Sequence, residues 1–168
     1  MEILTEIMWT SSAAMQPHML DHVQLASSWL EQEPYSKTKT PSELAQLDFG
    51  LLVLGGAEKE KPEPLGFGAL SQIGKCAWEL SSVVVHPEHR GKGVGGFIVG
   101  QLTQFFFEYG EPLYGDLCLV CVPHLQPFYE NYGYTALGKA PKFLDTGLQQ
   151  KAIYAIQQSK TFMLATIV

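Results

Sequence analysis

A basic, glycine-rich turn is the segment of this sequence best suited to bind a ligand. The stretch VVVHPEHRGKGVGG begins at Val83, and four of the six residues at positions 91–96 are glycine. Glycine lets the backbone approach a ligand closely and adopt positive φ, so successive N–H groups can point into one cavity. The first N–H groups of a helix lack intrahelical partners, and the helix dipole is positive there. With Arg90 and Lys92 adding charge, the turn predicts an anion site, and phosphate is the usual occupant.

A tight turn that needs its glycines only for geometry is the alternative to a ligand site. Gly95, Gly96 and Gly100 lie within or beside the helix that follows the turn. Each glycine inside a helix costs about 1 kcal/mol relative to alanine. A purely structural turn would gain little from them, so their presence favours ligand binding.

The turn matches one common nucleotide-binding pattern and lacks another. The P-loop string G-x-x-x-x-G-K-[ST] is absent, whereas GKGVGG fits the dinucleotide fingerprint G-x-G-x-x-G. In a dinucleotide-binding unit the first glycine directly ends the first strand of the domain. Here HPEHR intervenes, and several probable strands come earlier, so a different phosphate ligand is favoured.

Two separated motifs carry a family resemblance over residues 78–137. RGKGVG fits [QR]-x-x-G-x-[GA], and VVVHPEHRGKGVG resembles the acyl-CoA-binding signature of the GNAT superfamily of N-acyltransferases. LQPFYENYGY is similar to a later block of that superfamily. The resemblance implies one α/β (α+β, GNAT-like) domain over residues 1–168. Its mixed, largely antiparallel central sheet would have about six to seven strands flanked by helices. In this sheet, the strand before and the strand after the glycine-turn helix would splay apart from each other.

The resemblance also implies how acetyl-CoA would be held, with no metal. The backbone amides of the turn would bind the pyrophosphate, and the strand before it would bind the pantetheine arm through its main chain. A main-chain N–H near that strand would polarise the thioester carbonyl. The implied turn residues are Arg90, Gly91, Lys92, Gly93, Val94 and Gly95, and the implied strand residues are Val83, Val84 and Val85. The side chains of these three valines are equally well explained by ordinary packing in the core.

Attack of an amine on a thioester needs a base for the amine and an acid for the departing thiolate. By the resemblance, Glu79 in WELSS stands where many members carry a base that often acts through water. Tyr129 in PFYE matches the tyrosine that protonates the coenzyme sulfur. The alternatives are a solvated strand glutamate and a helix tyrosine packed against the core. Tyr132 and Tyr134 are predicted to be structural.

One position departs from the family pattern. Many members have asparagine seven residues before the tyrosine, where this chain has Val122. The form C-x-x-x-L-x-P-F-Y is similar instead to arylalkylamine N-acetyltransferases, which indicates an aromatic or aliphatic amine acceptor.

Seven strands and four helices are expected to position these residues. Strands are predicted over residues 2–9, 49–56, 65–72, 75–85, 113–122, 134–140 and 161–168, and helices over 17–30, 41–47, 94–109 and 123–133. The first helix would bury Leu20, Val23, Ser27 and Leu30. Residues 143–159 are ambiguous, and a loop with some helix is predicted there.

Composition limits the classes of partner. The chain has 168 residues, 46% apolar and 17% charged, with net charge −6, which disfavours general nucleic-acid binding. No apolar run reaches the roughly 20 residues that span a bilayer, and the acidic MEILTEIMW is unlike a secretion signal. Three cysteines fit a reducing compartment, so a cytoplasmic location is predicted, with no membrane partner.

One pair of cysteines and one pair of histidines are candidates for further sites. Cys118 and Cys121 have redox-motif spacing, but residues three apart on a strand face opposite sides, so buried packing is favoured. His18 and His22 could form a metal pair, but no third ligand is evident and surface placement is favoured.

Three other histidines lie near the two motifs. His86 and His89 belong to the loop that precedes the glycine turn, and His124 could relay protons to Tyr129.

The predicted function is acetyl transfer from acetyl-CoA to a primary amine, with a small molecule favoured, by direct attack in a ternary complex. The negative net charge slightly favours a cationic amine through long-range steering. A non-catalytic acyl-CoA-binding regulatory domain and a nucleotide-dependent oxidoreductase are the alternatives. A homodimer is left open, since the apolar TFMLATIV suits either the core or a dimer contact.

Overall fold

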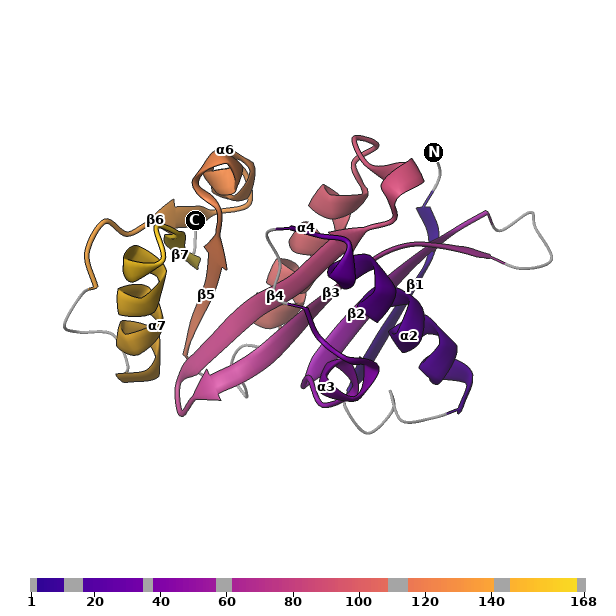
Figure 1. The fold of residues 1–168 in the computed structure, drawn as a ribbon, viewed down its shortest axis with the longest axis horizontal. Helices are drawn as coiled ribbons and strands as arrows, with labels where there is room; N and C mark the ends of the chain where they lie inside the picture. The colour runs from indigo at the N-terminus through magenta and orange to yellow at the C-terminus, as the bar shows by residue number, and fades with distance from the viewer. Residues whose placement is uncertain are drawn as a thin grey trace. The chain divides into compact units, whose positions relative to one another are not determined.

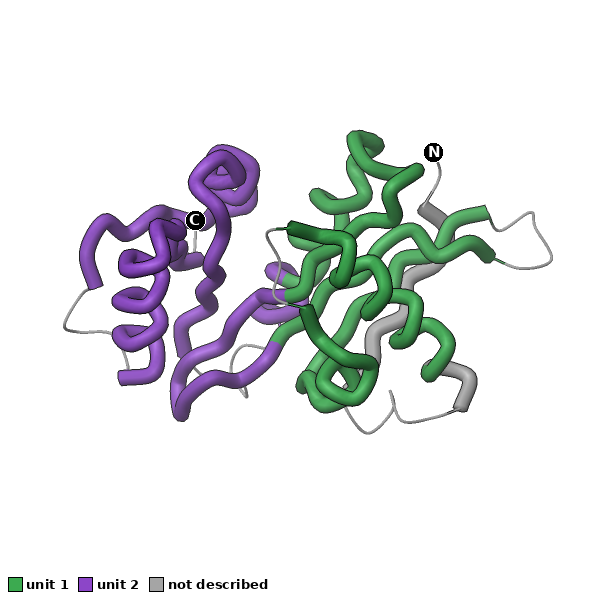
Figure 2. The backbone as a smooth tube through the Cα atoms, viewed as in Figure 1, with its two compact units in different colours: residues 1–70, 82–102 green, residues 71–81, 103–168 purple. Residues whose placement is uncertain are grey.

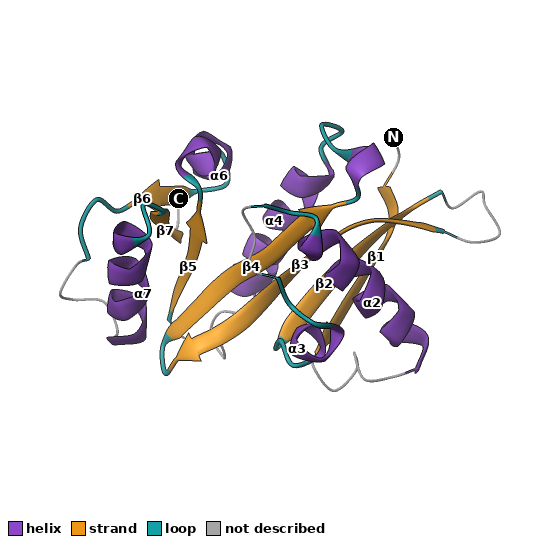
Figure 3. Ribbon diagram, in the orientation of Figure 1, coloured by secondary structure: helices purple, strands orange, loops and turns teal. Residues whose placement is uncertain are grey.

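The computed structural model describes residues 3–10, 17–34, 38–56, 62–108, 115–140 and 146–165, and its fold is drawn in Figure 1. The strands are β1 (Ile3–Thr10), β2 (Phe49–Gly55), β3 (Glu63–Gly74), β4 (Ala77–Val85), β5 (Asp116–Cys121), β6 (Tyr134–Ala136) and β7 (Thr161–Ala165). The helices are α2 (Pro17–Glu31), α3 (Pro41–Ala45), α4 (Val94–Glu108), α6 (Gln126–Glu130) and α7 (Thr146–Gln157). Two short 3-10 helices, η1 (Pro87–His89) and η2 (Pro123–Leu125), precede α4 and α6. Figure 3 shows the alternation of strands and helices along the chain.

The strands form a seven-stranded mixed sheet in the order β1-β2-β3-β4-β5-β7-β6. Strands β1 and β2, β2 and β3, β5 and β7, and β6 and β7 pair antiparallel, whereas β4 and β5 pair parallel. The β4–β5 ladder covers only Ala77 to Glu79 and ends where Glu79 faces Cys118. The ladder has no further pair among the described residues of the two strands. The fold-class prediction is therefore confirmed.

The chain divides into two compact units, coloured separately in Figure 2. Unit 1 comprises residues 1–70 and 82–102, and unit 2 comprises residues 71–81 and 103–168. Strands β3 and β4 and helix α4 each contribute residues to both units. The units are thus not consecutive segments of the chain, and the single domain over residues 1–168 stays a prediction.

In unit 1, helices α2 and α3 pack against β2, β3 and β4. The shared core contains Val23, Ala26 and Leu30 of α2 together with buried side chains of the strands. The predicted stripe on α2 is correct for Val23, Ser27 and Leu30, which are buried, but wrong for Leu20, which is 37% exposed. Ala26, one turn before Leu30, is also buried in this core, so the buried face of α2 begins at Val23 rather than at Leu20.

In unit 2, α7 is a 12-residue helix where the sequence predicts a loop with some helix. The expectation of a loop is wrong, because the buried positions Leu148, Ala152 and Ala155 do have helical spacing. These residues share a core with Ala77, Cys118 and Phe162. Packing against the strands thus stabilises a helix whose own apolar pattern is weak.

Strand β7 lies between β5 and β6, so both of its edges are paired. Phe162 and Met163 on it are buried. Core packing therefore accounts for the burial of Phe162 and Met163 in the apolar C-terminal segment.

The cysteines follow the predicted packing. Cys118 and Cys121 are buried on β5, Cys76 is exposed, and all three are free thiols. Within the described ranges no helix has both the length and the hydrophobicity needed to cross a membrane.

Candidate functional site

The end of β4 presents Val83, Val84 and Val85 in different environments. Val84 is buried in the core of unit 1, whereas Val83 and Val85 are half-buried. Ser82 just before them has φ of 57°, which is unusual for a residue other than glycine and interrupts the regular strand. The Lys39 ammonium donates a hydrogen bond of 2.6 Å to the Ser82 hydroxyl, which ties the chain before α3 to this irregular point.

The turn that follows has the geometry expected of an anion site. Gly91 and Gly93 have φ of 72° and 86°, and a Cβ on either would meet no atom within 4 Å, so the space beside the turn is open. The Phe97 amide donates to the Gly93 carbonyl and closes the first turn of α4. Among the described residues no acceptor is seen for the amides at positions 91–96. A row of unpaired donors at the positive end of a 15-residue helix attracts an anion.

The Arg90 side chain braces the turn rather than extending from it. Its Nε donates to the Val85 carbonyl at 3.2 Å, and its guanidinium lies 3.1 Å from the Glu33 carboxylate in the chain after α2. Exposed Lys92 is the other cation of the turn. Glu33 was not anticipated, since nothing in its local sequence marks it as a partner of the turn.

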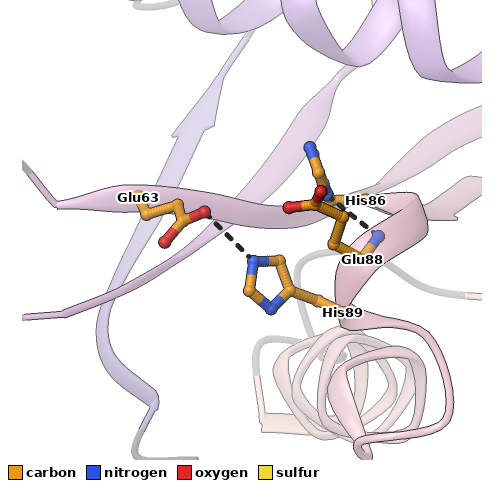
Figure 4. A network of polar contacts seen from close by, with 4 residues as sticks. All are labelled: Glu63, His86, Glu88 and His89. Carbon is orange, nitrogen blue, oxygen red and sulfur yellow. Dashed lines mark hydrogen bonds and ion pairs between the residues drawn. The ribbon is translucent and has the colours of Figure 1, made fainter.

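His86 and His89 hold the loop before the turn, as Figure 4 shows. His86 Nδ1 accepts a hydrogen bond from the Glu88 amide and so caps η1. The His86 ring also packs edge-on against Trp29. His89 Nε2 lies 3.2 Å from the Glu63 carboxylate at the start of β3. Both histidines therefore have structural contacts in the loop.

Glu79 is ion-paired in unit 2, whereas the sequence allows either a base or a solvated residue there. Its Oε1 lies 3.0 Å from Nζ of Lys151 on α7, and its side chain is 15% exposed. A fully solvated glutamate is therefore excluded. Lys151 is a residue that sequence reasoning missed. Its place on the packed face of α7 is not marked in the sequence, because two of the buried residues of that helix are alanines.

Tyr129 on α6 is buried, with its ring edge-on to Phe128 and to Tyr134. Burial, followed by the nearby Cys121, raises the pKa of Tyr129 to about 12. The hydroxyl therefore stays protonated at neutral pH and can only donate a proton. No hydrogen-bond partner for it is seen in the part of the chain that the structure describes.

Tyr134 has the structural role that was predicted for it. Its hydroxyl is buried and lies 2.9 Å from the Thr103 hydroxyl.

The remaining candidates lie around η2 or on α2. Val122 precedes η2 and gives it no side-chain cap, and His124 is exposed. The side chain of His18 lies outside the described residues. Among the residues that are described, no group of three or more metal-ligating side chains occurs.

The predicted site residues thus form two groups. Unit 1 brings the end of β4, the glycine turn and Arg90 together, and unit 2 contains Glu79 and Tyr129. The first group can hold an anion, and the second contains a carboxylate and a protonated phenol.

Comparison with known proteins identifies the family. A family model described as the acetyltransferase (GNAT) family matches residues 19–134, which include the turn, Glu79 and Tyr129. No curated protein sequence matches the chain significantly.

Solved structures show the same fold at low sequence identity. A Mycobacterium tuberculosis protein in complex with CoA is 16% identical, with a TM-score of 0.67 over 89% of this chain and 96% of that one. Escherichia coli ElaA is 15% identical, with a TM-score of 0.61 over 96% of this chain and 99% of that one.

N-acetylglutamate synthase from Neisseria gonorrhoeae, complexed with coenzyme A and N-acetyl-glutamate, is 10% identical, with a TM-score of 0.67. The match covers 98% of this chain and 35% of the synthase, so this chain spans about a third of that protein. The family match and the shared fold agree with the two motifs. The chain belongs to the GNAT family of acetyltransferases and is an acyltransferase.

Proposed function

We propose that this acyltransferase moves an acetyl group from acetyl-CoA to a primary amine of a small molecule, by direct attack in a ternary complex. The observation that carries the proposal is the row of amides without acceptors at positions 91–96, which opens α4 beside two glycines at positive φ. A pyrophosphate offers several oxygens to such a row, and Lys92 adds a positive charge.

In this proposal, the amides of Arg90, Gly91, Lys92, Gly93, Val94 and Gly95 bind the pyrophosphate of coenzyme A. The main chain of Val83, Val84 and Val85 binds the pantetheine arm. The half-buried state of Val83 and Val85 supports this, since neither residue is enclosed by the core. The Val85 carbonyl already accepts from Arg90, and it keeps a second lone pair.

The chemistry divides between Glu79 and Tyr129. Glu79 takes a proton from the ammonium of the acceptor, directly or through water, and frees the nitrogen lone pair. The nitrogen attacks the thioester carbonyl carbon, an amide C–N bond forms, and the C–S bond breaks. Tyr129 gives its proton to the departing thiolate; burial, which raises its pKa to about 12, keeps the hydroxyl protonated until that step and also makes it a weaker acid. Of the two protons that the nitrogen loses, one restores the Tyr129 hydroxyl and the other passes to water.

The acceptor is proposed to be an aromatic or aliphatic amine. The net charge of −6 favours a cationic substrate through long-range steering. A cytoplasmic location is proposed on the free state of the three cysteines. A homodimer stays open.

The test begins with calorimetric binding of acetyl-CoA and, separately, of NADH to the purified protein at low salt. Micromolar binding of acetyl-CoA without binding of NADH is expected. Gly93→Ala should weaken acetyl-CoA binding at least tenfold, because φ of 86° disfavours a side chain and the amides would turn away. Gly138→Ala is the matched control, since its new Cβ meets nothing within 4 Å.

Turnover is then followed by thiol release with a panel of arylalkylamines, aliphatic diamines and a short peptide with a free N-terminus. Release with the small amines supports the proposal, and release only with the peptide would reject the small-molecule acceptor. Binding of NADH in place of acetyl-CoA would contradict the assigned roles of the turn, Glu79 and Tyr129.

A further inference from the structure

The buried stripe of helix α7 contains one residue that does not fit a core. Positions 148, 151, 152 and 155 follow the i, i+3, i+4, i+7 spacing of a single helix face. Leu148, Ala152 and Ala155 are fully buried, whereas the remaining position is Lys151. Lysine is rarely placed on a core-facing stripe unless a partner holds its charge. The position therefore calls for a specific counter-charge.

The counter-charge is the carboxylate of Glu79. Lys151 Nζ lies 3.0 Å from Glu79 Oε1, and the two side chains are 34% and 15% exposed. Ala77 and Ala152 contribute small side chains to the core beneath, which lets α7 approach β4 closely. The long lysine side chain can then run along the helix face and reach Glu79 with its ammonium.

The Cys118 thiol lies near both charges of this ion pair. Burial and then the negative charge of Glu79 raise the pKa of the Cys118 thiol, and Lys151 acts in the opposite direction. Asp116, at the start of β5, is the other charged group that acts on this thiol. Cys118 is also the residue that faces Glu79 across the last β4–β5 pair. Lys151 therefore holds the carboxylate at the point where the β4–β5 ladder ends.

We propose that Lys151 is a positioning residue for Glu79, holding its carboxylate in one orientation for proton transfer. This inference rests on the proposed role of Glu79 as base. An unpaired, partly buried carboxylate would rotate toward solvent to recover hydration. A proton acceptor displaced by about 1 Å loses on the order of 100-fold in rate, so holding the carboxylate still has a direct kinetic value.

The inference is tested with Lys151→Met, Lys151→Arg, Glu79→Gln and the double variant Glu79→Gln/Lys151→Met, using an amine that the wild type acetylates. Lys151→Met should lower kcat about 10- to 100-fold while KM for acetyl-CoA stays within about twofold. Lys151→Arg, which keeps the charge, should recover most of kcat. Lys139→Met removes an exposed lysine from the same unit and is the control for lost charge alone.

The double variant decides whether Lys151 acts through Glu79. If it does, adding Lys151→Met to Glu79→Gln slows the enzyme no further. Thermal melting of each variant identifies those whose kcat falls because the protein unfolds. If Lys151→Met is one of them, the kcat of Lys151→Arg is compared with that of the wild type instead.

Two results would overturn the positioning role and leave the proposed function standing. One is a folded Lys151→Met protein with wild-type kcat. The other is a Lys151→Met substitution that slows the enzyme by the same factor whether residue 79 is glutamate or glutamine. Wild-type kcat in Glu79→Gln would remove both the base and its positioning residue, while acetyl-CoA binding and acetyl transfer would survive. Absence of thiol release from the wild type with every amine would overturn the proposed function itself, and this inference with it.

Discussion

Among the described glycines of unit 1, Gly68 on β3 is the one at which an added Cβ would come closest to a neighbouring side chain, so its replacement is expected to lower stability. A Cβ at this position would lie 2.5 Å from Cγ2 of Ile98 and 2.9 Å from Cδ1 of Leu102, both on α4. These contacts are far inside the ordinary carbon–carbon separation of about 3.5–4.0 Å. The absence of a side chain at Gly68 is what lets α4 lie directly on the strand.

The magnitude follows from which atoms must move. Ile98 Cγ2 is bonded directly to Cβ, and a β-branched side chain in a helix has one strongly preferred rotamer, so it cannot swing aside. Overpacking of this kind costs typically about 1–3 kcal/mol, and replacing a strand glycine returns about 0.5–1 kcal/mol of backbone entropy. Gly68→Ala should therefore lose about 1–2 kcal/mol of unfolding free energy. At roughly 2–4 °C per kcal/mol for a chain of this length, Tm falls by about 2–8 °C.

Urea denaturation with fluorescence and circular dichroism, together with thermal melting, measures this difference. Gly138→Ala is the matched control, because a Cβ there meets nothing within 4 Å and Tm should stay level or rise slightly. Ile98→Ala alone should destabilise the protein, but combined with Gly68→Ala it should cost less than the sum, since the new methyl group enters the space vacated.

Two results would refute the reasoning. One is a Gly68→Ala protein that melts with the wild type, and the other is strict additivity in the double variant. Either would mean that α4 does not pack on β3 closely enough for a methyl group at Gly68 to collide with Ile98.

Three further predictions concern hydroxyl and thiol groups. Tyr129→Phe should lower kcat about 100-fold with unchanged acetyl-CoA affinity. Because burial raises the pKa of Tyr129 from 10 to about 12, the wild type should also lose stability relative to this variant as pH rises from 10 to 12, and denaturation at several pH values checks the sign. Thr103→Val leaves the buried Tyr134 hydroxyl without its hydrogen-bond partner, and urea denaturation should show a loss of about 1–3 kcal/mol in the free energy of unfolding. A loss near zero would mean that solvent reaches that hydroxyl. A thiol reagent at about pH 8 should label Cys76 in the native protein and all three cysteines after unfolding, and rapid native labelling of a second thiol would contradict the burial of β5.

Local sequence predicted the elements whose pattern is strong. Helix α4 was expected because its apolar residues repeat at helical spacing, and Val94, Ile98, Leu102 and Phe106 are buried as that spacing requires. Helix α7 was underestimated for a physical reason. Ile153 and Ile156 are exposed on it while two of its buried residues are alanines, so the apolar pattern does not mark the face that packs.

In the candidate site, too, local features could be predicted from the sequence and long-range contacts could not. The turn is predicted from its own residues, because glycine and charge at fixed spacing are local properties, and Glu79 and Tyr129 are implied by the family resemblance. Their ion-pair partners are not predicted by either. Glu33 beside Arg90 and Lys151 beside Glu79 come from segments distant in the chain, and no periodicity relates them.

Local sequence is enough to predict a donor-rich turn at a helix start, most of the strands and helices around it, and the family resemblance of both motifs. These depend on backbone freedom, dipoles and hydrophobic spacing within a few residues of one another. Only the tertiary structure decided what Glu79 and Arg90 touch, because an ion pair forms between whichever side chains packing brings within reach. Packing of α7 on Ala77 and Cys118 is what brings Lys151 to 3.0 Å from Glu79.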